Sequence, residues 1–205
     1  MATRGSRTLL CAFVVAIATA LSAQTAQAGL LGTGSASYCD TVVHQPFLPF
    51  GDSAYYALTP GGSFEAGSPP WILSGGAKVV AGNEPYYVHG ANDRQSLYLP
   101  SGSSATSPSM CFAPGDWHVR LFAVSSGSTS GLKVTVVVRS LLGVLSVLDG
   151  GTVDPTGTWQ PSKRLELTLT NVTGLVGTSA ISLRFTPVGG TWRIDDAYLD
   201  PWLST

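Results

Sequence analysis

The stretch WHVRLFAV, residues 117 to 124, alternates between two kinds of side chain with a period of two. One side of this stretch carries Trp117, Val119, Leu121 and Ala123. The other side carries His118, Arg120 and Phe122. Because successive side chains of an extended chain point to opposite faces, the pattern predicts a β-strand with one face in an apolar core.

The same period recurs along most of the chain. It is found in SLYLP (96–100), LKVTVVV (132–138), LLGVLSVL (141–148), RLELTLT (164–170) and AISLRFTP (180–187). Turn signals such as SSGSTSG, DGG, DPTG and VGG separate these stretches, and no window after residue 28 has a helical period. Strands that follow one another without helices predict an all-β fold, a jelly-roll β-sandwich.

The first 28 residues have the layout of a secretory signal peptide. Arg4 and Arg7 precede the apolar run LLCAFVVAIATAL, and the small residues AQA (26–28) follow it. The run is about 13 residues long, whereas a membrane-spanning helix needs about 20. We therefore expect a secreted, extracellular protein with no membrane span once residues 1–28 are removed.

Two cysteines, Cys39 and Cys111, follow the signal peptide. Outside the cytoplasm an isolated pair is typical of a disulfide. Such a bond would close a loop of roughly 70 residues, which is worth about 4 kcal/mol. We expect an N-terminal arm, residues 29–52, tied down by this disulfide, with FLPF (47–50) covering a sheet edge, and a β-sandwich domain over 53–205.

Charge is sparse in this chain. Charged residues make up 11% of it and the formal net charge is −1, against about 25% charged residues in a typical protein. Lys and Arg do not cluster, so the electrostatic signature of nucleic-acid binding is missing. We expect a monomer whose partner, if it has one, is neutral and polar.

Near the C-terminus, TWRIDDAYLDP (191–201) places Asp195 and Asp196 in the middle of an apolar strand. A buried carboxylate is costly unless something neutralises it. A bound cation is one solution, and pairing with Arg193 or another arginine is the alternative. Alternation predicts that one of the two aspartates faces the site and the other faces solvent, but it does not decide which one.

Four motifs, in order, resemble non-catalytic carbohydrate-binding modules with the galactose-binding-like jelly-roll fold. They are GGSFEAGSPPWILSGGAKVV (61–80), HGANDRQSLYLP (89–100), PGDWHVRLFAV (114–124) and GTWRIDDAYLDP (190–201). The chain also resembles a group of uncharacterised secreted actinobacterial proteins that share text similar to SLYLPSGSSATSPSMC. The first resemblance implies binding of a polysaccharide or cell-surface glycan.

The resemblance also implies a structural calcium ion that joins the first strand to the last. Its implied ligands are Glu65, one of Asp195 and Asp196, and a carbonyl of the Gly90 loop, and the resemblance favours Asp195. This agrees with calcium's preference for six to eight oxygen ligands.

A glycan surface needs aromatic rings and planar polar groups on an open sheet face. The residues that we expect to form it are His118, Arg120, Phe122, Arg184, Tyr87 and Trp159, with Tyr86 and Glu166 beside them. Alternatively, Phe122 lies under a loop and Arg120 pairs with Glu166. Trp71, Trp117 and Trp192 are expected in the core.

Motifs of catalysis are sparse. Neither G-x-S-x-G nor H-E-x-x-H is present. His89 and Asp93 could in principle form an acid–base pair, but a simple loop hydrogen bond is favoured. Glu65 and Glu84 could be a glycosidase pair, although GNEP (82–85) indicates a turn that exposes Glu84. Binding without catalysis is the leading hypothesis; a structural or adhesion protein, and then a small glycan-active hydrolase or lyase, are the alternatives.

Overall fold

The computed structural model describes residues 1, 38, 42–66, 70–111, 116–127, 131–140, 145–168 and 178–200. The expected signal peptide therefore lies outside the described residues, apart from Met1. Cys39 lies outside them as well. No helix in the described part of the chain has the length and apolar character needed to cross a bilayer.

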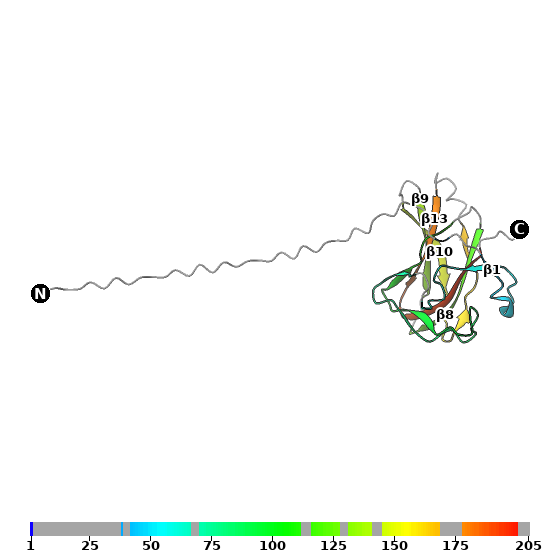
Figure 1. The fold of residues 1–205 in the computed structure, drawn as a ribbon, viewed down its shortest axis with the longest axis horizontal. Coiled ribbons are helices and arrows are strands. Elements are labelled where there is room, and N and C mark those ends of the chain that lie inside the picture. Colours follow the sequence, from blue (N-terminus) through cyan, green and yellow to red (C-terminus); the bar gives the residue numbers. More distant parts are fainter. Residues whose placement is uncertain are drawn as a thin grey trace. The chain divides into compact units, whose positions relative to one another are not determined.

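The strands form two antiparallel sheets that pack as a sandwich (Figure 1). The main path of the eight-stranded sheet has the order β1 (Val43–His44), β2 (Tyr56–Leu58), β14 (Thr191–Asp200), β5 (Gln95–Leu99) and β4 (Lys78–Ala81). Strand β14 also pairs with β8 (Asp116–Ser126). Strand β8 in turn pairs with β11 (Gln160–Pro161) and β12 (Leu165–Thr168). The six-stranded sheet has the order β10 (Leu145–Val153), β9 (Leu132–Ser140), β13 (Thr178–Pro187), β6 (Ser104–Thr106) and β3 (Ile72–Ser74), with β7 (Met110–Cys111) beside β13.

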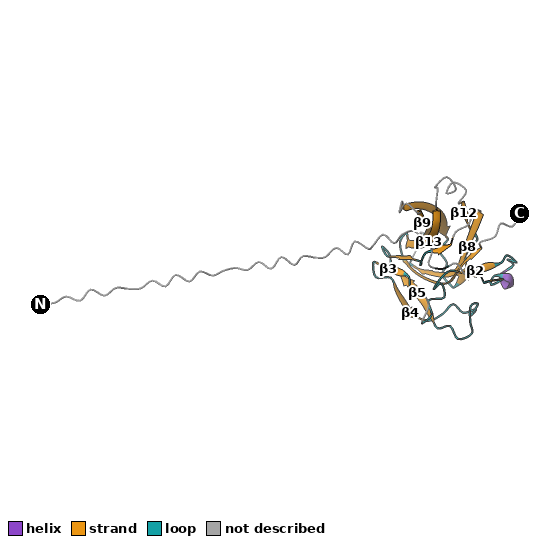
Figure 2. Ribbon diagram, turned by 45° about the horizontal axis from the view of Figure 1, so that its top comes forward, coloured by secondary structure: helices purple, strands orange, loops and turns teal. Residues whose placement is uncertain are grey.

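A short 3-10 helix, η1 (Leu48–Phe50), is the only helix among the residues described, as Figure 2 shows in purple. The prediction of an all-β sandwich is therefore confirmed. Two-residue periodicity was sufficient for this because each long strand buries one face between the sheets.

The main core lies between the two sheets, and the predicted alternation fills it. The residues of β8 and β9 in it are Trp117, Val119, Leu121, Ala123, Leu132, Val134, Val136 and Val138. Those of β12 and β13 are Leu165, Leu167, Ile181, Leu183 and Phe185. Trp71 and Trp192 also belong to it, so the three tryptophans predicted for the core are confirmed there.

Strand β14 changes phase at its two aspartates. Asp195 pairs with Phe122 and Tyr198 pairs with Arg120, so β14 advances three residues while β8 advances two. This extra residue is a β-bulge, and Asp196 takes a left-handed φ of 45° there. Trp192 and Ile194 enter the core before the bulge, and Ala197 and Leu199 enter it afterwards. Simple alternation therefore fails here: both aspartates are fully buried, and the prediction that one of them faces solvent is wrong.

A second, smaller cluster covers the other face of the eight-stranded sheet. Its fully buried members are Phe47, Tyr56, Phe122 and Tyr198, and Phe50, Ala54, Leu58, Val88 and Trp159 pack against them. Phe47 stacks on Phe122 with ring centroids 5.4 Å apart. The FLPF segment thus covers a sheet face, and the prediction that it covers an edge is wrong.

The backbone beside the two cysteines is paired. Tyr38 forms a parallel bridge with Met110, and the Cys111 N–H donates to the Tyr38 carbonyl at 2.9 Å. The disulfide between Cys39 and Cys111 stays a prediction because Cys39 is not among the described residues.

Candidate functional site

The sheet face predicted to bind a glycan is covered. Phe122 is fully buried, with its ring 5.4 Å from Phe47, 5.4 Å from Phe50 and 5.5 Å from Tyr86 between centroids. A ring enclosed by three others has no face left for a sugar. The assignment of Phe122 to the binding surface is wrong, and the alternative that it lies under a loop is confirmed.

Arg120 is buried beside Phe122 and neutralises Asp52. Its Nη1 lies 2.7 Å from Asp52 Oδ2, its Nε donates to the Ser162 carbonyl at 2.9 Å, and its guanidinium lies 4.2 Å from the Phe47 ring centroid. The predicted exposure of Arg120 and its alternative pairing with Glu166 are both wrong, because the N-terminal segment supplies the partner.

Asp52 is held in its ionised form by this arrangement. Burial alone would raise its pKa, but hydrogen bonds from the Tyr56 hydroxyl, the Ala54 N–H and Arg120 outweigh burial and lower the pKa below its ordinary value. The Tyr56 hydroxyl donates to Asp52 Oδ2 at 2.7 Å.

The remaining predicted sheet residues do not share one surface. His118 lies opposite Glu166 on the eight-stranded sheet, with its Nδ1 3.7 Å from Asp200. Arg184 belongs to the other sheet, where its Nε donates to Thr106 Oγ1 at 3.1 Å. A single surface containing both His118 and Arg184 is therefore not formed.

Tyr87 and Trp159 lie in loops, as predicted, and the two loops are in contact through Tyr86. The Tyr86 hydroxyl donates to the Trp159 carbonyl at 3.1 Å, and the Arg193 guanidinium lies 5.6 Å from the Trp159 ring centroid. Arg193 donates to the Ala81 and Gly82 carbonyls and to Ser96. Arg193 is therefore not the partner of the buried aspartates.

A pocket of about 450 Å³ opens beside this loop. Its lining residues are Ala81, Gly82, Asn83, Tyr87, Ala91, Asp93 and Arg94. Tyr87 is 51% exposed and holds a left-handed φ of 53°. Asn83 Oδ1 is buried, out of reach of solvent, and has no hydrogen-bond partner among the residues described.

A cluster of buried carboxylates lies behind the pocket. Glu84, Asp195 and Asp196 are all fully buried. The Glu84 carboxylate accepts the N–H groups of Tyr86 and Val88, and Asp195 Oδ2 accepts the Glu84 N–H at 3.1 Å. The prediction that GNEP exposes Glu84 is wrong, because its side chain turns inward to bind these backbone donors.

Asp195 and Asp196 are protonated more readily than ordinary aspartates. Burial, and then repulsion from Asp196, raises the pKa of Asp195 to about 9. Burial, and then repulsion from Glu84, raises the pKa of Asp196 to about 7. In the described part of the chain neither aspartate forms an ion pair with Lys or Arg.

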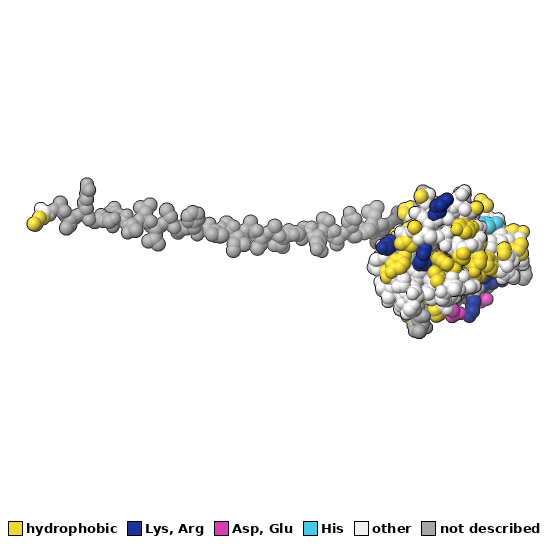
Figure 3. Space-filling view, turned by 90° about the horizontal axis from the view of Figure 1, so that it is seen from below, with side chains coloured by type: hydrophobic (Ala, Val, Ile, Leu, Met, Phe, Trp, Pro, Cys, Tyr) yellow, Lys and Arg dark blue, Asp and Glu magenta, His cyan; other side chains and the backbone are white. Residues whose placement is uncertain are grey.

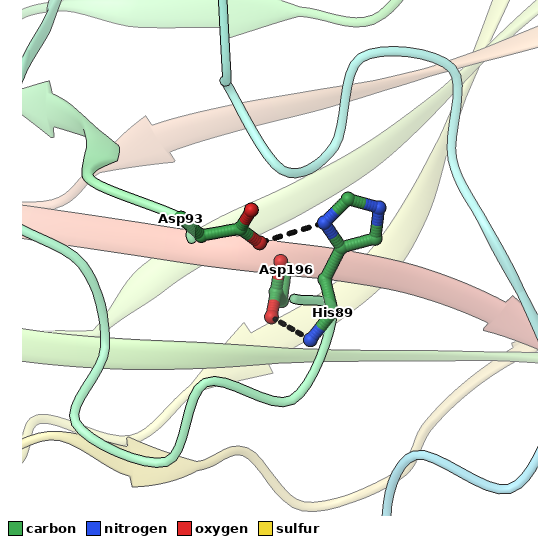
Figure 4. A group of neighbouring side chains, drawn as sticks. All are labelled: His89, Asp93 and Asp196. Carbon is green, nitrogen blue, oxygen red and sulfur yellow. Dashed lines mark hydrogen bonds and ion pairs between the residues drawn. The ribbon is translucent and has the colours of Figure 1, made fainter. Parts of the chain in front are cut away.

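His89, Asp93 and Asp196 form the group whose ligand atoms all lie within 4.8 Å of one another. Figure 4 shows His89 Nδ1 directed at Asp93 Oδ2, 2.7 Å away, and the Asp196 carboxylate beside them. The favoured loop hydrogen bond between His89 and Asp93 is thereby confirmed.

Only part of the predicted calcium set falls in this group. Glu65 Oε1 instead accepts the Arg94 and Gln95 N–H groups at 2.7 Å each, and the Gly90 carbonyl accepts the Asp93 N–H at 3.0 Å. Because His89 supplies a nitrogen where calcium prefers oxygen, the donor set fits calcium poorly. Calcium binding itself stays a prediction.

Comparison with known proteins supplies fold likenesses only. No family model matches the chain, and no curated protein matches it. Among solved structures, the chain resembles the CBM22-1 and GH10 modules of a Clostridium thermocellum endo-1,4-β-D-xylanase complexed with xylohexaose. The identity is 15% and the TM-score is 0.47, and the match covers 72% of this chain and 27% of that one.

Two further likenesses are to single modules. A family 61 carbohydrate-binding module complexed with β-1,4-galactotriose shares 20% identity, with coverage of 69% and 96% and a TM-score of 0.40. The family 11 module of a cellulosomal cellulase of Clostridium thermocellum shares 14% identity, with coverage of 75% and 99% and a TM-score of 0.39.

Proposed function

We propose that this chain is a secreted, non-catalytic domain that binds a neutral glycan in the pocket beside Tyr87. The observation that carries the proposal is an exposed aromatic ring, Tyr87, in one cavity with the polar residues Asn83, Asp93 and Arg94. Ligand pockets of about 300–1,000 Å³ with a few placed polar groups are typical for small ligands. A sugar ring would stack on Tyr87 while its hydroxyls form hydrogen bonds with the polar side chains that line the cavity.

The backbone at Tyr87 supports this assignment. A left-handed φ at a bulky residue costs about 1–3 kcal/mol, and such conformations cluster at ligand sites. Here the strained backbone presents the ring outward, at 51% exposure. On the face shown in Figure 3, Lys and Arg side chains stand apart among hydrophobic and uncharged polar ones, and charged residues make up only 11% of the chain, which suits a neutral partner.

Tyr87→Ala tests the proposal. A glycan array, followed by titration calorimetry with the best oligosaccharide, should show binding that is about 10-fold weaker in this variant, because the stacking platform is lost. Tyr55→Ala is the matched control: Tyr55 is 53% exposed and does not line the pocket. Equal affinities of the two variants, or no bound glycan at all, would contradict the proposal.

The burial of Phe122 and Arg120 favours one other candidate. A structural or adhesion domain would cover the sheet face with aromatic packing, as this chain does over its eight-stranded sheet. Such a domain would give no signal on the array in either variant. Export and a Cys39–Cys111 disulfide are part of both proposals, and the pairing of Tyr38 with Met110 supports the disulfide.

A further inference from the structure

The group formed by His89, Asp93 and Asp196 joins two distant parts of the chain. His89 and Asp93 belong to the loop between β4 and β5, and Asp196 occupies the bulge of β14. Figure 4 shows the three side chains converging, with ligand atoms that all lie within 4.8 Å of one another. One ion could contact all three.

One atom of this group is left without a partner. Asp196 is fully buried, and its Oδ2 accepts the His89 N–H at 3.1 Å. Its Oδ1 is buried with no hydrogen-bond partner in the described part of the chain. A buried carboxylate oxygen without a donor is costly, so the orphaned oxygen indicates a missing positive ligand.

The surrounding charge favours a cation. Asp195 directly precedes Asp196, and its Oδ2 accepts the N–H of Glu84, whose side chain is also fully buried. Asp93 is paired with His89. Among the described side chains, the His89 ring is the one basic group within hydrogen-bond distance of these carboxyl groups. Four carboxyl groups against one imidazole need protons or a cation to balance their charge.

We propose that His89, Asp93 and Asp196 bind a divalent transition-metal cation, of which Zn²⁺ is the type. Imidazole with carboxylate oxygens suits zinc and its neighbours, whereas calcium and magnesium take oxygen ligands. The ion would replace the proton that His89 Nδ1 and Asp93 Oδ2 share. Three protein ligands leave a fourth position for water or another donor.

The site has a structural consequence that is independent of glycan binding. It would tie the 82–94 loop to the bulge of β14, two segments that are joined here by the hydrogen bonds from Glu84 N–H to Asp195 and from His89 N–H to Asp196. Because Asp93 also lines the pocket, the metal would fix one wall of it. The proposal does not depend on which glycan, if any, enters.

Titration calorimetry of the metal-stripped protein is the direct test. The protein is treated with a chelator, exchanged into metal-free buffer and titrated separately with ZnCl₂ and CaCl₂, with no glycan present. We expect one Zn²⁺ per chain and an affinity at least about 100-fold above that for Ca²⁺. Tighter binding of Ca²⁺, or no binding of Zn²⁺, would overturn the proposal.

His89→Asn and Asp196→Asn locate the site. Loss of supporting partners alone weakens metal binding about 10–100-fold, so loss of a ligand should weaken Zn²⁺ binding by at least about 100-fold. His118→Asn is the matched control, since His118 lies on the same sheet near other carboxylates and should leave affinity unchanged. Zn²⁺ binding that survives His89→Asn at full affinity would overturn the assignment.

A spectroscopic measurement distinguishes loss of the metal site from misfolding of the variant. Co²⁺ bound to the wild-type protein should give visible absorption bands that His89→Asn abolishes, while far-UV circular dichroism stays unchanged because the His89 side chain is 36% exposed. Bands that persist in this variant count against the proposal. Glycan binding is scored separately with Tyr87→Ala, so failure of the metal site and failure of the glycan pocket are distinguishable.

Discussion

Two groups of carboxylates contact the same eight-stranded sheet and are neutralised in different ways. Asp52 has a cation and a hydroxyl: Arg120 Nη1 and the Tyr56 hydroxyl both lie 2.7 Å from its Oδ2. Asp195 and Asp196 accept only backbone N–H groups among the described hydrogen bonds: Asp195 accepts those of Glu84 and Asp196, and Asp196 accepts that of His89. As a result, the pKa of Asp52 is lowered and the pKa values of the pair are raised.

The difference shows that burial alone does not set the charge of a carboxylate in this domain. The Asp52 group contains its own counter-ion and is complete. The Asp195–Asp196 group must take up a proton or a cation, since an unpaired buried charge is strongly disfavoured. Only the second group therefore has a reason to bind something from solution.

Removing the counter-ion from the complete group should have the largest effect. Arg120→Ala removes the guanidinium that lies 2.7 Å from Asp52 and its contact with the Phe47 ring, and leaves Asp52 only the more distant Arg164 Nε, at 3.9 Å. Breaking a fully buried pair costs about 3–5 kcal/mol; because Asp52 is partly buried and keeps Arg164 nearby, we expect the lower end, about 3 kcal/mol. The free energy of unfolding from guanidinium titration should fall by that amount. Arg184→Ala on the other sheet is the control, with an expected loss below about 1 kcal/mol; equal losses would show that the Asp52 pair is not special.

The two groups should also give opposite pH dependences in metal-free protein. In the folded state the pKa of Asp195 is raised to about 9. In the unfolded chain its pKa is about 4, so between these pH values only the folded state holds the proton. Stability should therefore fall as pH rises through this window, by up to about 1.4 kcal/mol per pH unit for one proton. The lowered pKa of Asp52 has the reverse sign, and its contribution is lost as pH falls below about 4.

Melting temperatures from pH 3 to pH 9, with and without a chelator, check this prediction. The chelated protein should be most stable at mildly acidic pH, and added Zn²⁺ should flatten the alkaline side. A chelated protein that gains stability steadily between pH 5 and pH 8 would contradict the raised pKa values.

Much of the sandwich was predictable because side-chain alternation is a local property. In β8, β9 and β13 the period of two assigns each residue to a face without any knowledge of the partner strand, and the core residues Leu121, Val136 and Leu183 lie where alternation places them. The same argument assigned Phe122 to the opposite face correctly. It could not show that Phe47 covers that face, because the contact joins residues 75 positions apart.

The candidate site was less predictable because it depends on register. The bulge exists only in the pairing of β14 with β8, where Asp195 opposes Phe122 and Tyr198 opposes Arg120. Without it, alternation places Asp195 and Asp196 on opposite faces. The position of Glu84 likewise involves a distant partner, because its backbone N–H donates to Asp195, 111 positions away. The motif resemblance pointed to the two aspartates, but it named neither Glu84 nor Asp93 as a ligand.

Neutralising one member of the Asp195–Asp196 group should stabilise the metal-free protein. In Asp196→Asn the amide oxygen can still accept the His89 N–H, and the NH₂ group takes the place of the unpartnered Oδ1. Asparagine also tolerates the left-handed φ of 45° found there. We expect about 1–2 kcal/mol of added stability at pH 8 in the presence of chelator, measured by guanidinium denaturation. At pH 5 the gain should shrink, because the wild-type aspartate is then already protonated.

The smallest effect should come from trimming the complete group while leaving its ion pair intact. Tyr56→Phe removes one hydrogen bond to Asp52 Oδ2, and it should cost about 1 kcal/mol at neutral pH. Because that bond helps to lower the pKa of Asp52, the acid side of the stability profile should move to higher pH, with no change on the alkaline side. Tyr198→Phe is the matched control: its hydroxyl contacts His44 at 3.2 Å rather than Asp52, so the acid side should stay in place. If both variants shift the acid side equally, the stability lost at low pH does not belong to Asp52, and the two carboxylate groups are not as separate as their contacts indicate.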